Sequence, residues 1–298
     1  MGSVNWHHMR PQPPPEGRLV TSRSQKLSGN ISLCIGNLSF LRALHLQNRP
    51  WSPPELERLR RLDILHLHNN SIGGEIPANL SGCSKLIGFD VAYIKLVGQL
   101  PVEFGYSLLK LQVIAFGANK LSGTILASIF NISTINVFDL GTNQIKGSIP
   151  SEIGNALPNF EFVRIDYNQF MGYIPVSISN NSNLFNLEIG WNELTAGVPA
   201  LDKQHKLRWF AVAFNNLGSG HSGDLDFLYS LINATSLVEI NFHCNNFGGM
   251  LTETIGNLST NLQNMNLNQN QILGSIPYGI GNLINLENLL VLLNFLRL

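Results

Sequence analysis

Cysteine, charged residues and long apolar runs are all scarce in this chain of 298 residues. The three cysteines, Cys34, Cys83 and Cys244, form no C-x-x-C pair, so we expect no metal site, and buried free thiols are the favoured interpretation of the first two. Charged residues make up only 13% of the chain, with 19 basic and 19 acidic side chains. This balance argues against a nucleic-acid-binding surface or a polybasic membrane patch. The apolar end, residues 289–298, is shorter than the about 20 residues needed to span a membrane, so we predict no direct membrane insertion.

Motifs of catalysis are missing as well. Residues 218–223 formally fit the pattern G-x-G-x-x-G, but no strand-to-helix unit surrounds them and no kinase motif follows. We interpret this segment as a flexible excursion within a long repeat. No Gly-x-Ser-x-Gly elbow of a hydrolase occurs either. The chain is therefore predicted to have no catalytic residues, no enzymatic activity and no cofactor.

A leucine-rich phrase recurs along almost the whole chain, and each copy ends at the same turn position, here called the beat, which is asparagine in all but one of the copies given below. Successive beats are separated by 24, 25, 24, 25, 24, 23, 30, 25 and 24 residues. This period is typical of a leucine-rich-repeat array. The beats are Asn70, Ile94, Asn119, Asn143, Asn168, Asn192, Asn215, Asn245, Asn270 and Asn294.

The parts of one repeat predict its local structure. The alternation in Leu65-x-Leu67 is that of a short strand with both leucines directed inward. An asparagine buried in the following turn can donate to and accept from neighbouring backbone groups, so a column of them would satisfy amides along the array. Ile94 breaks that column once. The rest of each repeat is expected to return along the convex side as a short, irregular or helical segment.

The repeats become degenerate toward the start of the chain. Arg49 stands where an asparagine is expected, and Gln25 occupies the beat before it. We predict a proline-rich disordered leader or degraded cap over residues 1–18. One leucine-rich-repeat domain of about 11 repeats is expected over residues 19–298, truncated at the C-terminus.

Several phrases resemble the plant-specific repeat x-L-x-G-x-I-P: residues 74–77, 147–155 and 274–277. The chain is thus similar to the ectodomains of plant leucine-rich-repeat receptor-like serine/threonine kinases. The long step between Asn215 and Asn245 is similar to a feature of the subfamily that senses bacterial peptides. Such ectodomains usually begin with a secretion signal and a cysteine-paired cap, whereas residues 1–12 contain neither an apolar core nor a cysteine.

The fold class that follows is an α/β repeat, a right-handed leucine-rich-repeat solenoid with a concave parallel β-sheet. The resemblance implies an extracellular or cell-surface region, without its kinase domain, that binds a peptide or protein ligand and a co-receptor in defence or developmental signalling. One alternative is a secreted leucine-rich-repeat interaction or inhibitor protein. Another is a truncated gene product without a function of its own.

N-glycosylation motifs support an extracellular location. Four of these asparagines lie twelve residues before their beat, so the sugars would share one convex flank and leave the concave face free. The candidates are Asn30, Asn37, Asn79, Asn131, Asn180, Asn233 and Asn257.

The candidate binding face is the row of outward strand residues, six, four, two and one positions before each beat. Large aromatic and charged residues collect there on neighbouring repeats in the middle of the array. With strands about 4.8 Å apart, Tyr167, Trp191 and Phe214 are predicted to form a column roughly 10 Å long. Their alternative role is to cover neighbouring repeats. The candidate ligand-binding residues are Tyr93, Phe162, Arg164, Asp166, Tyr167, Glu188, Trp191, Trp209 and Phe214.

Overall fold

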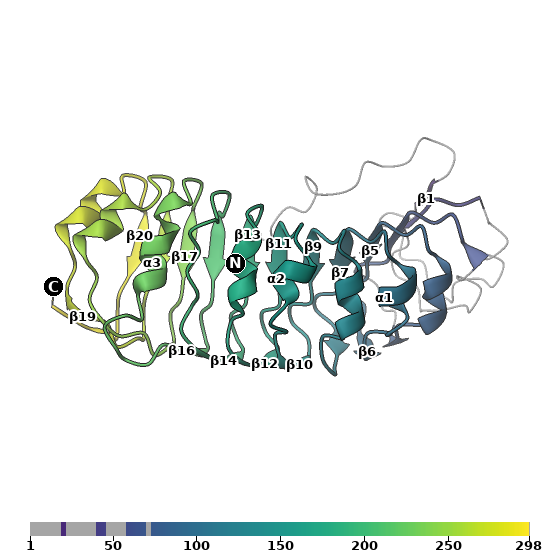
Figure 1. The fold of residues 1–298 in the computed structure, drawn as a ribbon, viewed down its shortest axis with the longest axis horizontal. Coiled ribbons are helices and arrows are strands. Elements are labelled where there is room, and N and C mark those ends of the chain that lie inside the picture. The colour runs from purple at the N-terminus through teal and green to yellow at the C-terminus, as the bar shows by residue number, and fades with distance from the viewer. Residues whose placement is uncertain (1–18, 22–39, 46–57, 70–72, 298) are drawn as a thin grey trace. The chain divides into compact units, whose positions relative to one another are not determined.

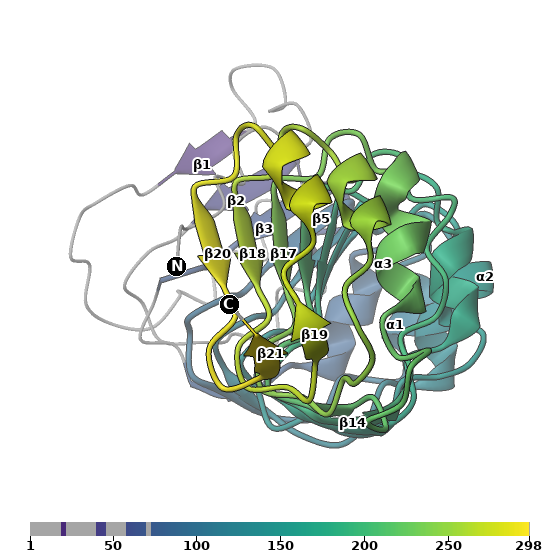
Figure 2. The same cartoon turned by 90° about the vertical axis from the view of Figure 1, so that its left-hand side faces the viewer.

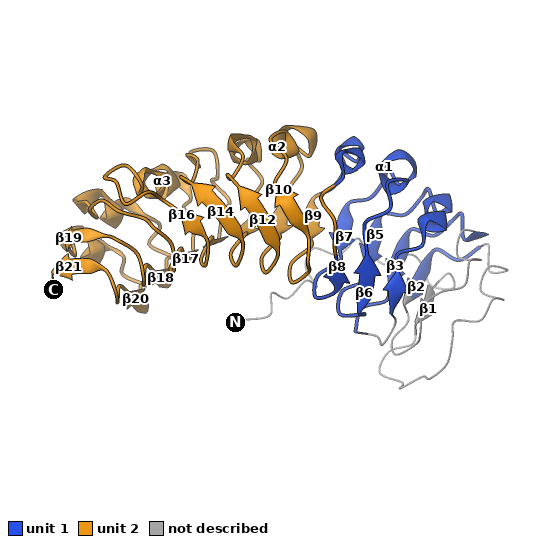
Figure 3. Ribbon diagram, turned by 90° about the horizontal axis from the view of Figure 1, so that it is seen from below, with its two compact units in different colours: residues 1–121, 126–135 blue, residues 122–125, 136–298 orange. Residues whose placement is uncertain are grey.

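The computed structural model describes residues 19–21, 40–45, 58–69 and 73–297, drawn in colour in Figure 1. The leader over residues 1–18, Cys34, Asn70 and the candidates Asn30 and Asn37 lie outside these residues. The chain divides into two compact units, residues 1–121 with 126–135, and residues 122–125 with 136–298 (Figure 3).

The first unit is built on parallel strands that pair in chain order, β1 with β2, β2 with β3, β3 with β5 and β5 with β7. A smaller parallel sheet pairs β4 with β6 and β6 with β8. The main strands are β1 (Leu19–Thr21), β2 (Ala43–His45), β3 (Ile64–His66), β5 (Gly88–Asp90) and β7 (Val113–Ala115). The remaining elements are β4 (Gly74–Glu75), β6 (Leu96–Gly98), β8 (Lys120–Leu121), the 3-10 helices η4 (Ala78–Gly82) and η5 (Ala127–Asn131), and α1 (Phe104–Ser107).

The second unit repeats this plan. Its main parallel sheet has the order β9-β11-β13-β15-β17-β18-β20, and β10-β12-β14-β16 form a second sheet. The main strands are β9 (Val137–Asp139), β11 (Phe162–Arg164), β13 (Asn186–Glu188), β15 (Trp209–Ala211), β17 (Glu239–Asn241), β18 (Asn264–Asn266) and β20 (Asn288–Leu290). The second sheet contains β10 (Lys146–Ser148), β12 (Gln169–Gly172), β14 (Glu193–Ala196) and β16 (Asn216–Leu217), and β19 (Leu273–Ser275) pairs with β21 (Phe295–Arg297).

Short helices occupy the side of the second unit opposite its main sheet, as the end-on view shows (Figure 2). They are α2 (Ile153–Ala156), η6 (Val176–Asn180), α3 (Asp226–Ser230), η7 (Leu231–Asn233), η8 (Glu253–Asn257) and η9 (Tyr278–Asn282). The longer repeat between Asn215 and Asn245, with its 30-residue step, places its extra residues on this side, where α3 is followed directly by η7. None of the helices in the described part of the chain is long and apolar enough to cross a membrane. The leucine-rich-repeat solenoid with a parallel sheet is thus confirmed.

The core of each repeat consists of the inward side chains that the leucine pattern predicts. Leu65 and Leu67 are fully buried, and so are Leu187 and Ile189 to within 1%. Phenylalanines fill the wider spaces behind the sheet; Phe227 on α3 packs at 5.5 Å against Phe242 after β17. Apolar burial at every repeat is the main source of stability in such an array, because each repeat packs only on its neighbours.

The predicted asparagine column is present in the second unit. Nδ2 of Asn215 donates to the carbonyl oxygens of Ile189 (3.2 Å) and Val212 (3.1 Å), while its Oδ1 accepts from the backbone N–H of Leu194 at 3.0 Å. Asn168, Asn192, Asn245 and Asn270 repeat this pattern. Ile94, which breaks the column, is fully buried in the first unit.

Replacing Asn215 by alanine is therefore expected to destabilise the protein by roughly 2–4 kcal/mol, because it leaves buried backbone groups of two neighbouring repeats without partners. Urea unfolding followed by circular dichroism measures this loss. Asn216 is the matched control, since its side chain is exposed and its replacement by alanine removes none of these bonds. Equal unfolding midpoints for the two variants would contradict the structural role of the column.

Candidate functional site

The outward residues of the second unit form regular rows because the parallel strands pair without offset. Arg164 lies opposite Asp139 on one side and Glu188 on the other, and the row continues to Ala211 and Asn241. A second row, two residues earlier on each strand, runs through Phe162, Asn186, Trp209 and Glu239. The face is therefore assembled from β9 to β17, all within one compact unit.

The residue just before each beat also points to this face, because its backbone is left-handed. The φ angles are 51° at Tyr167, 53° at Trp191 and 54° at Phe214. A positive φ is unfavourable for large side chains, so the turn breaks the alternation of the strand and adds a further outward position. Ala118 and Thr142 adopt the same conformation at the same position, so the repeat imposes it whatever the residue.

Three aromatic rings stack at this position, as their spacing predicts. The ring centroids of Tyr167 and Trp191 are 4.9 Å apart with planes 13° from parallel, and those of Trp191 and Phe214 are 3.6 Å apart at 20°. His243 closes the series with an edge contact to Phe214 at 4.7 Å. We call Tyr167, Trp191 and Phe214 the aromatic ladder. Trp191 remains 42% exposed, which makes the ladder an accessible apolar surface.

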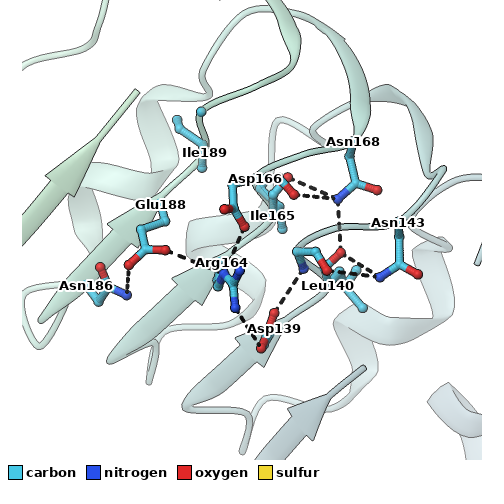
Figure 4. Close-up of polar contacts among 12 residues, drawn as sticks. Asp139, Leu140, Asn143, Arg164, Ile165, Asp166, Asn168, Asn186, Glu188 and Ile189 are labelled. Carbon is cyan, nitrogen blue, oxygen red and sulfur yellow. Dashed lines mark hydrogen bonds and ion pairs between the residues drawn. The ribbon is translucent and has the colours of Figure 1, made fainter. Parts of the chain in front are cut away.

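Asp166, the residue before Tyr167, belongs to a network of charged side chains that joins neighbouring repeats (Figure 4). Nε of Arg164 donates to Oδ1 of Asp166 at 2.9 Å and lies 3.5 Å from Oε2 of Glu188, while Nη1 of Arg164 is 3.9 Å from Oδ2 of Asp139. Gly141 makes room for this arrangement, because a Cβ atom there would come within 2.3 Å of Oδ1 of Asp166. We call Asp139, Arg164, Asp166 and Glu188 the ionic cluster.

Burial controls the protonation of this cluster. Burial raises the pKa of Asp139 to about 7, although the positive charge of Arg164 opposes that rise. Burial likewise raises the pKa of Asp166 to about 6 against the same opposing charge. Burial by itself would lower the pKa of Arg164, but the three surrounding carboxylates raise it, so this side chain stays charged. Near neutral pH the cluster is therefore close to a change in its net charge.

Not all of the predicted site residues reach this face. Phe162 is fully buried, so it is not exposed on this face as the alternation predicts. The strand register places it between Val137 and Asn186, which are also buried. Tyr93 is 57% exposed but belongs to the first unit. Asp166 is only 9% exposed, because it is engaged with Arg164.

The remaining predicted residues lie together in the second unit. Trp209 is half-buried and held on two sides: its ring meets Phe185 at 4.7 Å, and the guanidinium of Arg208 lies 4.8 Å from its centroid. One half-buried residue of the face was missed, Glu239, together with two buried polar residues next to it, Asp139 and Asn186. They stand four or six positions before their beats, so the same positional rule applied to every repeat would have found them.

The glycine-rich segment 218–223 is not organised as a phosphate loop. The backbone N–H groups of Ser219, His221 and Gly248 all donate to Oδ2 of Asp224, at 2.8, 3.1 and 2.9 Å. Burial alone would raise the pKa of Asp224, but these hydrogen bonds outweigh it and lower the pKa. A side-chain carboxylate thus occupies the place that an anion would take, which agrees with a structural role for this segment.

Comparisons with known proteins give the chain its relatives. The model of the Leucine Rich Repeat family matches residues 61–83 and 261–283. The LRR receptor-like serine/threonine-protein kinase EFR of Arabidopsis thaliana is 40% identical over 87 residues, which are 29% of this chain and 8% of that protein. The receptor kinase-like protein Xa21 of Oryza sativa subsp. japonica is 44% identical over 66 residues, 22% of this chain and 6% of that one. The matched segments thus span less than a tenth of these relatives.

Solved structures extend the likeness to most of the chain. The ectodomain of the Arabidopsis receptor kinase HAESA, solved with an N-terminally extended IDA peptide hormone ligand, superposes with a TM-score of 0.81 at 27% identity. That match covers 90% of this chain and 44% of the other. A TDR receptor structure gives a TM-score of 0.77 at 26% identity, covering 90% and 50%. HAESA has also been solved with the peptide hormone and the co-receptor SERK1, a match at 22% identity and a TM-score of 0.61 that covers 90% and 60% and concerns the fold alone.

Proposed function

This chain is a leucine-rich-repeat solenoid related to the ectodomains of plant leucine-rich-repeat receptor-like kinases, and from that relationship we propose that it is an extracellular ligand-recognition region. Its ligand is a peptide or protein bound by the outward face of the second unit. The whole receptor acts in defence or developmental signalling, and the chain itself carries out no chemistry. A co-receptor is the second partner we propose, by analogy with the HAESA complex.

The observation that carries this proposal is the aromatic ladder. Three large rings occupy consecutive left-handed positions of a repeat that accepts alanine or threonine there. Their size is therefore not required by the turn itself. Exposed tryptophan and tyrosine beside arginine are also the residue types that contribute most to binding at protein interfaces.

A selection experiment tests the proposed function. The full chain would be probed with a synthetic library of acetylated nine-residue peptides in which the four central positions are randomised. We expect peptides to be enriched on the wild-type chain and not on a variant in which Tyr167 and Trp191 are both alanine. Equal recovery on both proteins would exclude the ladder as the recognition site.

The cell-surface location is proposed from the family relationship and from the placement of the glycosylation motifs. Asn131, Asn180, Asn233 and Asn257 are each exposed and each form the last residue of a short 3-10 helix, away from the main sheets. Asn79 lies half-buried within η4. Sugars at the four exposed positions would leave the ladder accessible.

Secretion from plant cells is therefore expected to add N-glycans at Asn131, Asn180, Asn233 and Asn257. Peptide mass spectrometry before and after enzymatic deglycosylation detects each occupied asparagine by its conversion to aspartate. A secreted chain with unmodified asparagine at all four positions would contradict the proposed arrangement. Asn155 is exposed on the same side without the motif and provides the internal control.

A further inference from the structure

The outward face of the second unit has more negative than positive charge at its centre. A single guanidinium serves three carboxylates, and only its contact with Asp166, at 2.9 Å, has hydrogen-bond length. Glu188 at 3.5 Å and Asp139 at 3.9 Å are held less closely. Glu239 adds a fourth carboxylate on β17; burial and the charge of Glu188 raise its pKa, and the positive charge of the N-terminus opposes that rise. The carboxylates of the face therefore outnumber the one guanidinium that pairs with them.

The buried side-chain amide of Asn186, next to the cluster, also lacks a hydrogen-bond donor. Asn186 has no exposed surface, and its Nδ2 atom is directed at the cluster and donates to Oε1 of Glu188 at 3.0 Å. Among the described residues, its Oδ1 atom has no hydrogen-bond partner. Buried acceptors of this kind are rarely left unpaired in proteins. The amide thus adds one more acceptor to a group that already lacks donors.

The strand register places a small side chain, that of Ala211, close to two of these carboxylates. Glu188 pairs with Ala211, and Trp209 pairs with Glu239 on the next strand. Ala211 therefore lies between β13 and β17, whose backbones are about 10 Å apart. On β17 the residue opposite Ala211 is Asn241, and Glu239 lies two residues earlier, opposite Trp209. The methyl group of Ala211 is short, so a long side chain can lie over it from Glu188 diagonally toward Glu239. The ring of Trp209, fixed by Phe185 and Arg208, forms one border of this place.

We propose that the ligand of this face presents a basic side chain, arginine or lysine, that lies over Ala211 between Glu188 and Glu239. The adjoining apolar part of the peptide packs against the aromatic ladder. This inference rests on the proposed function and adds the chemical class of ligand that the face selects. Charge complementarity gives such a contact specificity, since a neutral residue there would leave the carboxylates unpaired.

The peptide selection can test this inference with two further proteins. In the first, Glu188→Gln and Glu239→Gln remove two charges from the face at nearly constant shape. In the control, Glu193→Gln and Glu152→Gln remove two charges from exposed positions on β14 and before α2, away from the face. Circular dichroism establishes that each variant is folded. A parallel library with free amino termini separates a side-chain cation from a terminal one.

Enrichment of arginine or lysine at one central position is expected on the wild-type and control proteins. It should fall at least tenfold on the Glu188→Gln, Glu239→Gln protein. Peptides that require the ladder but show no basic preference would overturn the inference and leave the proposed function standing. Binding only by peptides with free amino termini would also overturn it. If no peptide requires the ladder, the proposed function fails and the inference fails with it.

Discussion

Replacing Tyr167 and Trp191 together by alanine is expected to weaken binding of the peptides selected on the wild-type chain by roughly 100- to 1,000-fold. Truncation of an aromatic residue at the centre of an interface commonly costs about 2 kcal/mol or more, and two such losses, even if not additive, reach this range. The two rings stack with centroids 4.9 Å apart, and their removal also leaves Phe214 without its neighbour on one side. Fluorescence titration or calorimetry with one selected peptide measures the change.

The fold should tolerate this double substitution. Ala118 already adopts φ of 55° at the equivalent position of its repeat, so alanine is compatible with the left-handed turn. Met171 and Tyr173 serve as the matched control, because they are exposed apolar residues of the same unit that lie at or just after β12 of the other sheet. Their replacement by alanine removes comparable surface and should leave binding within twofold. Loss of the folded circular-dichroism signal in the ladder variant alone would show instead that the rings are structural cover.

Much of this face follows from the sequence because the repeat is regular. Once the beat is placed, the positions one, two, four and six residues earlier are known for every strand, and parallel pairing without offset aligns them into rows. The stacking of Tyr167, Trp191 and Phe214 could therefore be predicted. The solenoid itself, with its asparagine column and short convex helices, follows from the same period.

The burial of individual side chains could not be predicted in this way. Phe162 occupies an outward position by the alternation rule, yet it is fully buried, as are Val137 and Asn186 in the same row. Alternation gives the direction of a side chain and says nothing about what else packs on that face. Three members of the ionic cluster, Arg164, Asp166 and Glu188, were predicted at this face. Asp139 was missed, because it joins them only through the pairing of β9 with β11.

Replacement of Asp139 should give the second large effect, because ionisation of its buried carboxyl destabilises the folded protein. With its pKa raised to about 7, this carboxyl keeps its proton in the folded chain at pH values where the unfolded chain has released it. The folded state consequently loses stability as the pH rises from about 4 to about 7, and the full penalty, on the order of 4 kcal/mol, is present above pH 7. Replacement by asparagine, which cannot ionise, removes that penalty.

The Asp139→Asn protein is therefore expected to unfold at a higher temperature than wild type at pH 8, by roughly 5–10 °C, and to lose most of this advantage at pH 4.5. The gain in unfolding temperature is limited because Arg164 loses one of the three carboxylates around it. The asparagine oxygen can still accept a hydrogen bond from the backbone N–H of Gly141, as Asp139 does at 2.9 Å. Differential scanning calorimetry at the two pH values measures both quantities.

Asp90 is the matched control for this experiment. It occupies the same repeat position in the first unit and accepts a hydrogen bond from the backbone N–H of Ala92 at 3.2 Å. Its carboxylate lies 3.0 Å from Nδ1 of His68, whereas Asp139 shares an arginine with other carboxylates. Asp90→Asn should give no increase in unfolding temperature at pH 8. If Asp139→Asn lowers the unfolding temperature at pH 8, then the ionised carboxylate stabilises the fold and the shortage of positive charge on this face does not exist. The stability measurement thereby tests, without any ligand, the electrostatic premise on which recognition of a basic side chain depends.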